Sequence, residues 1–354
     1  MKAGAALDVP SASAIPKTNF DWLPLALVAL LAALAWPLIG SNSTWLTLTV
    51  AGLAMGMIVF IIASGLTLVF GLMDVLNFGH GVFIALGAYV GLSVLAQMPQ
   101  WTASPELWRN VAAVMVAMAC ACAVAAAVGW LFERVLVRPV YGQHLKQILI
   151  TMGGMIIGEE IIKMIWGPTP VSLELPLALR GVVILGDAAV ERFRLLAMLI
   201  GALVLAAMLF TLNRTKLGLL VRAGVQDREM VESLGYRIRR LFVGVFVAGS
   251  ALAGMGGTLW SVFQHGASPQ MGAQVNVLIF IVIIIGGLGS TLGCFVGALL
   301  VGLMANYTGF LLPKAAMFSN IALMAAVFGF CGRSDNAISA RNPLRLLACA
   351  DTMR

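Results

Sequence analysis

Long apolar runs, separated by short polar clusters, make up most of the chain. A membrane-spanning helix needs about 20 mainly apolar residues, so each run of that length predicts a span. The pattern therefore predicts an all-α polytopic membrane protein with about ten transmembrane helices, some broken or re-entrant where glycines interrupt the run. The predicted spans are residues 22–39, 45–70, 78–97, 109–133, 146–165, 194–213, 241–264, 275–290, 293–312 and 314–330.

The composition agrees with a membrane location and excludes an ordinary soluble globular protein. Hydrophobic residues are 61% of the chain and charged residues 10%, whereas soluble domains carry about 25% charged residues. The net charge is +7, but the positive residues lie between apolar runs and not on one polar face, so we expect no nucleic-acid partner. The five cysteines contain no Cys-x-x-Cys pair and predict neither a disulfide framework nor a metal site. We expect no cofactor.

Lys and Arg residues are distributed unevenly between alternate loops. If ten helices alternate in direction, one set of loops holds sixteen of the 22 Lys and Arg residues, the other set holds five, and Lys163 lies within a span. The positive-inside rule then places both termini in the cytoplasm. We therefore expect a cytoplasmic N-terminal tail over residues 1–21 with no cleaved signal peptide, a transmembrane domain over 22–330, a main outside loop over 166–193, and a cytoplasmic tail over 331–354.

A polar break interrupts the apolar sequence between residues 65 and 91. Asp74, Asn77 and His80 recur every three residues there, with Gly79 and Gly81 beside them. Irregular backbone at membrane depth is tolerated only where protein buries it or water reaches it. A helical or 3₁₀ turn would point the three polar side chains the same way, so we interpret these five residues as a candidate wall of a translocation pathway. The alternative is a histidine that only hydrogen-bonds between packed helices.

A second glycine-rich break lies near the C-terminal end of the apolar sequence. Its candidate pathway residues are Gly286, Gly287, Gly289 and Ser290. Residues 81–86 and 293–298 share the pattern of Gly, any residue, Phe and a β-branched residue, each following a break. Corresponding breaks in two halves are typical of duplicated transporters, and a chance match is the alternative. The pattern predicts a two-half repeat.

Three charged residues lie within the predicted span 146–165. Glu159 and Lys163 stand four residues apart, which places them on one helix face, and Glu160 lies beside them. One interpretation is that they snorkel to the outer interface near Trp166. The other is that they line a polar path, because a charge at the bilayer centre needs a partner or water.

The loop over residues 214–240 is the longest charged stretch away from the termini. Acidic and apolar residues alternate in it at helical spacing, which predicts a short amphipathic helix that ends at Gly235. A membrane-surface helix is one interpretation. A docking element for a cytoplasmic protein is favoured, because an anionic membrane surface would repel the acidic residues. The residues expected to contribute to docking are Arg222, Asp227, Glu229, Glu232 and Gly235.

Three blocks of sequence resemble the permease subunit of LIV-type ABC importers for branched-chain amino acids. They run from Gly65 through Asn77-Phe78-Gly79-His80-Gly81 to Tyr89, from Leu217 to Gly257, and from Gly286 to Gly297. The similarity extends over roughly residues 50–312. The tail from Gly329 onward lacks the Arg-Pro-Gln-Gly-Leu-like ending of the family, and we assign no function to it.

The resemblance implies a permease subunit that translocates branched-chain amino acids or related small polar solutes across the cell inner membrane. It implies four kinds of partner: two ATP-binding subunits that hydrolyse ATP, a second permease subunit in a heterodimer, a periplasmic substrate-binding protein, and the lipid bilayer. Glu229 and Gly235 occupy matching positions of the Glu-Ala-Ala-x₃-Gly pattern by which ABC permeases contact the ATPase. The solute could be a branched-chain amino acid, urea, an amide or an aromatic acid.

Two other classes of function are weighed against an ABC permease. A secondary transporter or channel would use Asp74, His80 and the group of Glu159, Glu160 and Lys163 as ion sites. An intramembrane enzyme is least favoured, because the three histidines lie in separate regions without a His-Glu-x-x-His or paired-Asp motif. No lysine follows a glycine in the P-loop pattern, so the energy for an ABC mechanism must come from a partner.

Overall fold

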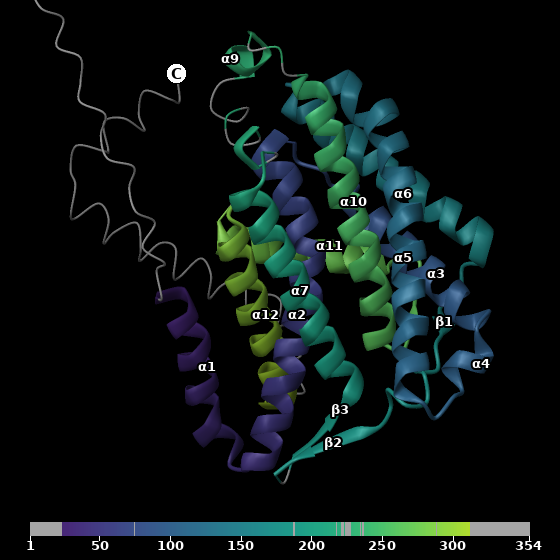
Figure 1. The fold of residues 1–354 in the computed structure, drawn as a ribbon, viewed down its shortest axis with the longest axis vertical. Coiled ribbons are helices and arrows are strands. Elements are labelled where there is room, and N and C mark those ends of the chain that lie inside the picture. The colour runs from purple at the N-terminus through teal and green to yellow at the C-terminus, as the bar shows by residue number, and fades with distance from the viewer. Residues whose placement is uncertain are drawn as a thin grey trace, which may run out of the picture.

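The computed structural model is almost entirely helical (Figure 1) and describes residues 23–73, 75–186, 188–216, 218–220, 223, 228–233, 235, 237–287 and 289–311. The helices are α1 (Leu23–Ile39), α2 (Asn42–Met73), α3 (His80–Ala96), α4 (Pro99–Thr102), α5 (Leu107–Phe132), η1 (Glu133–Val137), η2 (Arg138–Val140), α6 (His144–Trp166), α7 (Arg192–Arg214), α9 (Arg228–Ser233), α10 (Ile238–Phe263), α11 (Met271–Gly286) and α12 (Thr291–Leu311). Strand β1 (Val171–Ser172) pairs with β4 (Gly266–Ala267), and β2 (Val182–Leu185) pairs with β3 (Ala188–Glu191), both antiparallel.

The described helices include five that are long and apolar enough to cross a membrane. They are α2, α5 continued through η1 and η2, α7, α10 and α12, while α1, α3 and α11 are shorter apolar helices. Nine of the ten predicted runs each coincide with a helix, and the run 314–330 lies outside the described residues. These helices indicate a multi-pass membrane protein. The number of crossings stays a prediction, as do the two tails, which lie outside the described residues.

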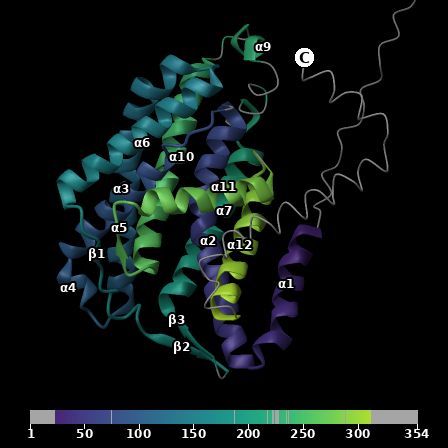
Figure 2. The ribbon, with the colours of Figure 1, turned by 180° about the vertical axis from the view of Figure 1, so that it is seen from behind.

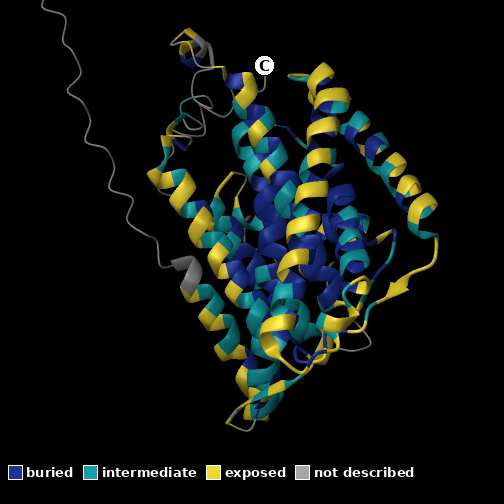
Figure 3. Cartoon of the chain, turned by 45° about the vertical axis from the view of Figure 1, so that its right-hand side comes forward, coloured by how far each residue is buried: buried dark blue, intermediate teal, exposed yellow. Residues whose placement is uncertain are grey.

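Helix α2 forms the centre of the molecule. The six consecutive residues from Ile58 to Ala63 are all fully buried, and a helix that is apolar all round is expected in a core. α2 packs against α10 and α12, and α10 also packs against α3 and α5. From behind, α11 lies between α3 and α12, and it contacts both (Figure 2). Figure 3 shows buried residues concentrated in this interior and exposed residues on the outer helices.

Glycines bring the central helices into backbone contact. A Cβ atom added at Gly65 of α2 would collide with the backbone of Gly249 in α10, and one added at Gly87 of α3 would collide with the backbone of Gly254 in the same helix. In membranes, small residues at interfaces let helices approach closely enough to gain dispersion energy. The core therefore depends on α10 fitting tightly against two neighbours.

Two features lie at opposite ends of the molecule. The β2–β3 hairpin is at the end where α4 lies, and α9 is at the other end, beside the start of α10 (Figure 1). The loop over 166–193 was predicted from the sequence, but the strands within it were not. The predicted short helix before Gly235 is confirmed: α9 ends at Ser233, and Gly235 has a φ of 84°, a conformation that favours glycine after a helix.

Candidate translocation site

The first polar break separates α2 from α3. α2 ends at Met73, residues 75–79 are not α-helical, and α3 begins at His80. The Nε2 atom of His80 lies 3.2 Å from the carbonyl oxygen of Ile62. Ile62 is eleven residues before the end of α2, which corresponds to about 16 Å along a helix. The chain therefore turns back along α2, and α3 begins beside the interior of α2 and not at its end.

Asn77 and His80 are enclosed by protein. Their exposed fractions are 1% and 0%. The Oδ1 and Nδ2 atoms of Asn77 and the Nδ1 atom of His80 find no hydrogen-bond partner among the described residues. An unpaired buried polar group costs about 1–3 kcal/mol, so this position has hydrogen-bonding capacity that the surrounding helices do not use. Asp74, which was predicted to lie beside them, is outside the described residues.

Polar side chains from α6 and α11 close over the break. The backbone N–H of Phe78 donates to Oγ1 of Thr151 at 3.2 Å, and Nδ2 of Asn276 donates to the carbonyl oxygen of Phe78 at 2.9 Å. Gln147 lies one turn before Thr151 on α6 and is also buried. Its Oε1 atom and Oδ1 of Asn276 have no hydrogen-bond partner within the described part of the chain. We refer to Asn77, His80, Gln147, Thr151 and Asn276 together as the break cluster.

The two glycines beside the break allow neighbouring helices to approach it. A Cβ atom at Gly79 would lie 2.5 Å from the ring of Phe132 and 3.1 Å from the carbonyl oxygen of Thr151. At Gly81 it would lie 2.7 Å from the carbonyl oxygen of Gly272 in α11. These positions therefore accommodate close packing in this conformation. Their predicted place on a pathway stays a prediction.

The second break is built differently. α11 ends at Gly286 and α12 begins at Thr291, with Gly287 and Gly289 at φ values of 84° and 82°. Gly287, Gly289 and Ser290 are exposed, whereas Gly286 is partly buried. A Cβ atom at Gly71, near the end of α2, would lie 2.6 Å from Cα of Gly289. The second break thus packs against the C-terminal end of α2, whereas the break cluster is buried beside the interior of α2, near Ile62.

The sequence pattern did not predict Gln147, Thr151 and Asn276 as members of this site. Thr151 and Asn276 are polar residues within apolar runs, whereas Gln147 directly follows Lys146 at the start of its run. A polar residue in a membrane helix is a signal for a functional or packing contact. That signal was available but gave no indication of where the residues point. Only the packing of α6 and α11 on the break brings these residues to Phe78.

A neutral polar cavity lies at the end of α10 opposite α9. It has a volume of about 370 Å³ and lies between the β1–β4 strands and the start of α11. Ser172, Gln264, His265 and Gln274 line it, together with Met271. Met271 begins α11, and Asn276 of the break cluster follows five residues later, which is about 8 Å along the helix. The first turns of α11 therefore connect this cavity with the break cluster.

The charged residues of α6 form an ion-pair group near the same region. Nζ of Lys163 lies 3.0 Å from Oε1 of Glu159 and 2.9 Å from Oε1 of Glu160. Glu159 also lines a small cavity of about 10 Å³ with Gly81 and Gly272, a volume close to the minimum that holds one water. The predicted pairing on one helix face is confirmed. The choice between an interface role and a pathway role stays open.

The predicted docking residues are only partly described. Arg222 and Asp227 lie outside the described residues. Glu229 and Glu232 belong to α9, whose short helix precedes Gly235. α9 lies at the end of the molecule where α7 finishes and α10 begins (Figure 1). Among the described elements, α9 contacts α10.

Comparison with known proteins identifies the family. A model described as branched-chain amino acid transport system / permease component matches residues 48–329. The chain is 28% identical over 258 residues to the high-affinity branched-chain amino acid transport system permease protein LivH of Escherichia coli (strain K12), covering 71% of this chain and 82% of LivH. It is 28% identical over 261 residues to the corresponding protein BraD of Pseudomonas aeruginosa, covering 72% and 82%.

A third relative is the permease protein LivM of Escherichia coli (strain K12), from a high-affinity branched-chain amino acid transport system. The identity is 29% over 307 residues, covering 78% of this chain and 66% of LivM. The region matched by the family model contains both breaks, α9 and all the helices from α3 to α12. The chain therefore belongs to the family of branched-chain amino acid transport system permease components.

Proposed function

We propose that the chain is a membrane-spanning permease subunit of a binding-protein-dependent ABC importer. It translocates branched-chain amino acids or related small polar solutes across the cell inner membrane. Two ATP-binding subunits supply the energy, a second permease subunit completes a heterodimer, and a periplasmic binding protein delivers the solute. The family membership and the names of LivH, BraD and LivM support this assignment.

The break cluster is the observation that carries the proposal. Its members place unpaired polar atoms in the interior of an apolar helical core. An amino acid in transit needs donors and acceptors for its ammonium and carboxylate groups, since leaving them unpaired in an apolar interior is costly. Asn77 offers both a donor and an acceptor, and Gln147 and Asn276 offer acceptors. The described conformation is closed, and a shift of α6 and α11 would open the cluster to a solute.

The arrangement of helices suggests how coupling reaches this site. α9 immediately precedes α10, and α10 contacts α2 and α3 through glycines at Gly249 and Gly254. ATP-driven movement at α9 would be transmitted along α10, because close glycine contacts allow one helix to shift against another as a rigid body. In this proposal Asp74, Gly79, Gly81 and the second break (Gly286, Gly287, Gly289 and Ser290) also face the pathway. Arg222, Asp227, Glu229, Glu232 and Gly235 form the contact with the ATPase.

The proposed topology has ten transmembrane helices with both termini in the cytoplasm. Five helices long enough to cross, the apolar α1, α3 and α11, and α6 with its terminal ion pairs support it. α9 would then be cytoplasmic and the β2–β3 hairpin periplasmic. The neutral polar cavity would face the substrate-binding protein.

The substitution Asn77→Leu tests the pathway assignment. With cognate partners in cells lacking their own permease, we expect uptake of labelled leucine, isoleucine or valine to fall about tenfold, the effect of raising a transport barrier by about 1.4 kcal/mol. Asn306→Leu is the matched control, because Asn306 donates to the carbonyl oxygen of Gly302 on α12, away from the break. Equal uptake by both variants, at equal amounts in the membrane, would contradict the assignment.

The substitution Gly235→Pro tests the coupling assignment. Gly235 has a φ of 84°, and proline fixes φ near −65°, so the chain after α9 would have to change direction. We expect uptake to be lost while ATP hydrolysis by the partner subunits continues without solute movement. Normal uptake by this variant would count against a coupling role.

A secondary transporter is the second candidate. The observation that favours it is Glu159, whose carboxylate pairs with Lys163 and lines the small cavity beside Gly81. The purified chain in liposomes, with an ion gradient and without ATPase subunits, separates the two candidates. Solute uptake under these conditions would favour the secondary transporter, and uptake that requires the ATPase subunits and ATP supports the importer.

A further inference from the structure

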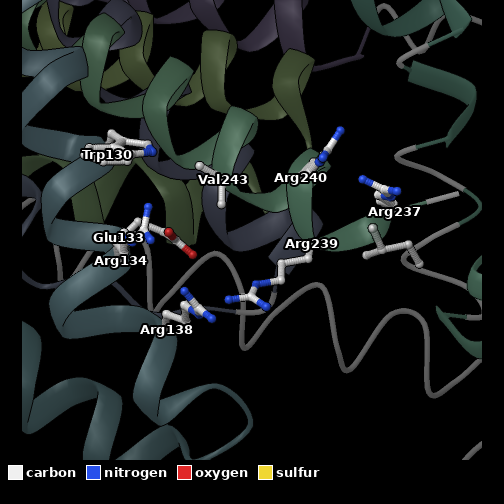
Figure 4. Close-up of a pocket in the computed structure, with 9 residues that line it drawn as sticks. Trp130, Glu133, Arg134, Arg138, Arg237, Arg239, Arg240 and Val243 are labelled. Atoms are coloured by element: carbon white, nitrogen blue, oxygen red, sulfur yellow. The ribbon is translucent and has the colours of Figure 1, made fainter.

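An arginine-rich cavity lies at the α9 end of the molecule, away from the break cluster. Its volume is about 780 Å³, and it is formed by the end of α5, by η1 and η2, and by the start of α10. The five arginines that line it are Arg134, Arg138, Arg237, Arg239 and Arg240. Figure 4 shows the guanidinium groups of Arg138 and Arg239 directed toward the same space from opposite sides.

The cavity carries a large excess of positive charge. Among the described residues, Glu133 is the one acidic residue that lines the cavity, so the five arginines and Glu133 together carry a formal charge of +4. Glu133 is 1% exposed and accepts a hydrogen bond of 2.7 Å from the hydroxyl of Tyr141. Three of the arginines lie at or beside the first turn of α10, where the helix dipole disfavours positive charge. An anion in the cavity would offset both the mutual repulsion and this unfavourable dipole.

Apolar side chains on the outer surface adjoin the arginines. Trp130 lines the cavity and is 46% exposed, while Leu131 and Val135 are 53% and 57% exposed. The guanidinium carbon of Arg134 lies 5.4 Å from the centre of the Trp130 ring. A tryptophan with adjacent arginine at the end of an apolar helix is typical of the boundary between acyl chains and headgroups. Both helices that frame the cavity are long enough to cross a membrane.

We propose that this cavity binds the phosphate of an anionic phospholipid. Guanidinium groups match phosphate oxygens in bidentate geometry, which favours Arg138 and Arg239 as the central contacts. The acyl chains would lie along the exposed apolar side chains Trp130, Leu131 and Val135. Basic pockets between membrane helices are a recurrent form of site for anionic headgroups. The adjoining apolar surface favours a lipid over a free phosphate or an acidic protein segment.

Lipid retention by the purified chain tests the proposal. The chain is placed in nanodiscs that contain equal molar amounts of phosphatidylglycerol and phosphatidylcholine. It is then released into detergent, and the lipids that stay bound are identified by native mass spectrometry. We expect phosphatidylglycerol to be retained about thirtyfold over phosphatidylcholine, as two arginine contacts of about 1 kcal/mol each near a membrane surface would produce. Equal retention of the two lipids by the wild-type chain would overturn the proposal without any variant being made.

Paired variants locate the site. Arg138→Gln with Arg239→Gln should abolish the preference, and Arg138→Lys with Arg239→Lys should retain part of it. The matched control is Arg109→Gln with Arg180→Gln, because these exposed arginines pair with Glu106 and Glu174 outside the cavity. The control should behave as the wild type. Loss of the preference in the control, or its survival in the first double variant, would overturn the proposal.

Two further experiments distinguish an anionic lipid from a free phosphate and from a protein partner. Glycerol 3-phosphate added to the lipid-free protein should bind far more weakly than the lipid, and comparable binding would mean that the phosphate alone is recognised. Purified ATPase subunits should bind the Arg138→Gln, Arg239→Gln variant as they bind the wild type. Loss of this binding with unchanged lipid preference would assign the arginines to a protein partner. These measurements need no transport, so their failure is distinct from failure of the proposed importer function.

Discussion

The two glycine-containing breaks satisfy their backbone groups in different ways. In the first break, partners from two distant helices bond the backbone of Phe78, through Thr151 of α6 and Asn276 of α11. In the second, the partners are local: Ser290 Oγ accepts from the N–H of Gly293 at 3.1 Å, as a helix N-cap does. The first break is thus hydrogen-bonded to two other helices, whereas the hydrogen bonds of the second among the described residues are local, although its backbone packs against Gly71 of α2.

This difference bears on function. A transport site must change when the surrounding helices move, and a break whose hydrogen bonds come from α6 and α11 meets that requirement. A turn that caps its own helix can keep its structure through such a movement. Similar glycine content in the sequence therefore conceals two different structural roles.

The sharpest test of the comparison is Gly81→Val in the first break. A Cβ atom there would lie 2.7 Å from the carbonyl oxygen of Gly272, so α3 and α11 would have to separate. We expect a loss of stability of about 3 kcal/mol, at the upper end of the usual range for overpacking, together with loss of uptake. Thermal unfolding in detergent measures the first effect. A midpoint unchanged from the wild type would mean that α11 does not close on the break in the membrane.

A smaller effect is expected from Asn276→Leu. The substitution removes the donor to the carbonyl oxygen of Phe78 and leaves this oxygen buried, which costs about 1–3 kcal/mol. The loss of uptake should exceed what the lower stability alone accounts for, because the break cluster loses a polar member. Val277→Ala is a suitable control, since Val277 is the next residue of α11 and is 56% exposed. The same loss of uptake in both variants would show that α11 tolerates no substitution. It would then give no support for a specific role of the break cluster in transport.

The dependence of the first break on α6 can be measured by hydrogen exchange. Thr151→Val removes the acceptor for the Phe78 N–H, so this amide should exchange about tenfold faster, which corresponds to the loss of a bond worth about 1.4 kcal/mol. The exchange of Gly293 should not change. Faster exchange of both amides would mean that the two breaks open together, and the distinction between them would fail.

The smallest effect is expected from Ser290→Ala in the second break. The substitution removes an N-cap and should cost about 1 kcal/mol of stability. Uptake should remain within about twofold of the wild type, because a locally capped turn transmits little to other helices. Thermal unfolding and uptake assays measure the two quantities on the same preparation. A loss of uptake comparable to that of Asn276→Leu would show that the second break, which the proposed function also places along the pathway, changes with the surrounding helices as the first break does.

The apolar pattern predicted the helices well because membrane helices satisfy their backbone internally. It also located both breaks, since glycines and polar residues interrupt the runs at residues 74–81 and 286–293. The β2–β3 hairpin was missed although Val182–Leu185, a two-residue turn and Ala188–Glu191 form a hairpin pattern. In the middle of a loop flanked by apolar runs, that short pattern was not recognised.

The candidate site was predictable only in part. Asn77 and His80 were identified, and both are buried in the break. Gln147, Thr151 and Asn276 were not, because their relation to the break depends on contacts 73 to 198 residues apart in the chain. Periodicity predicts the face of a residue on its own helix, but not the helix that it meets.

The length of α2 determines how far the break cluster lies from each membrane surface. Its 32 residues span about 48 Å, whereas the hydrocarbon layer is about 30 Å thick. α2 must therefore project beyond this layer, tilt within it, or both, because the helix is longer than the hydrocarbon layer is thick. A thinner or thicker bilayer changes how much of α2 emerges at each membrane surface. Because the imidazole of His80 lies against the carbonyl oxygen of Ile62, the distances from His80 to the two ends of α2 stay constant.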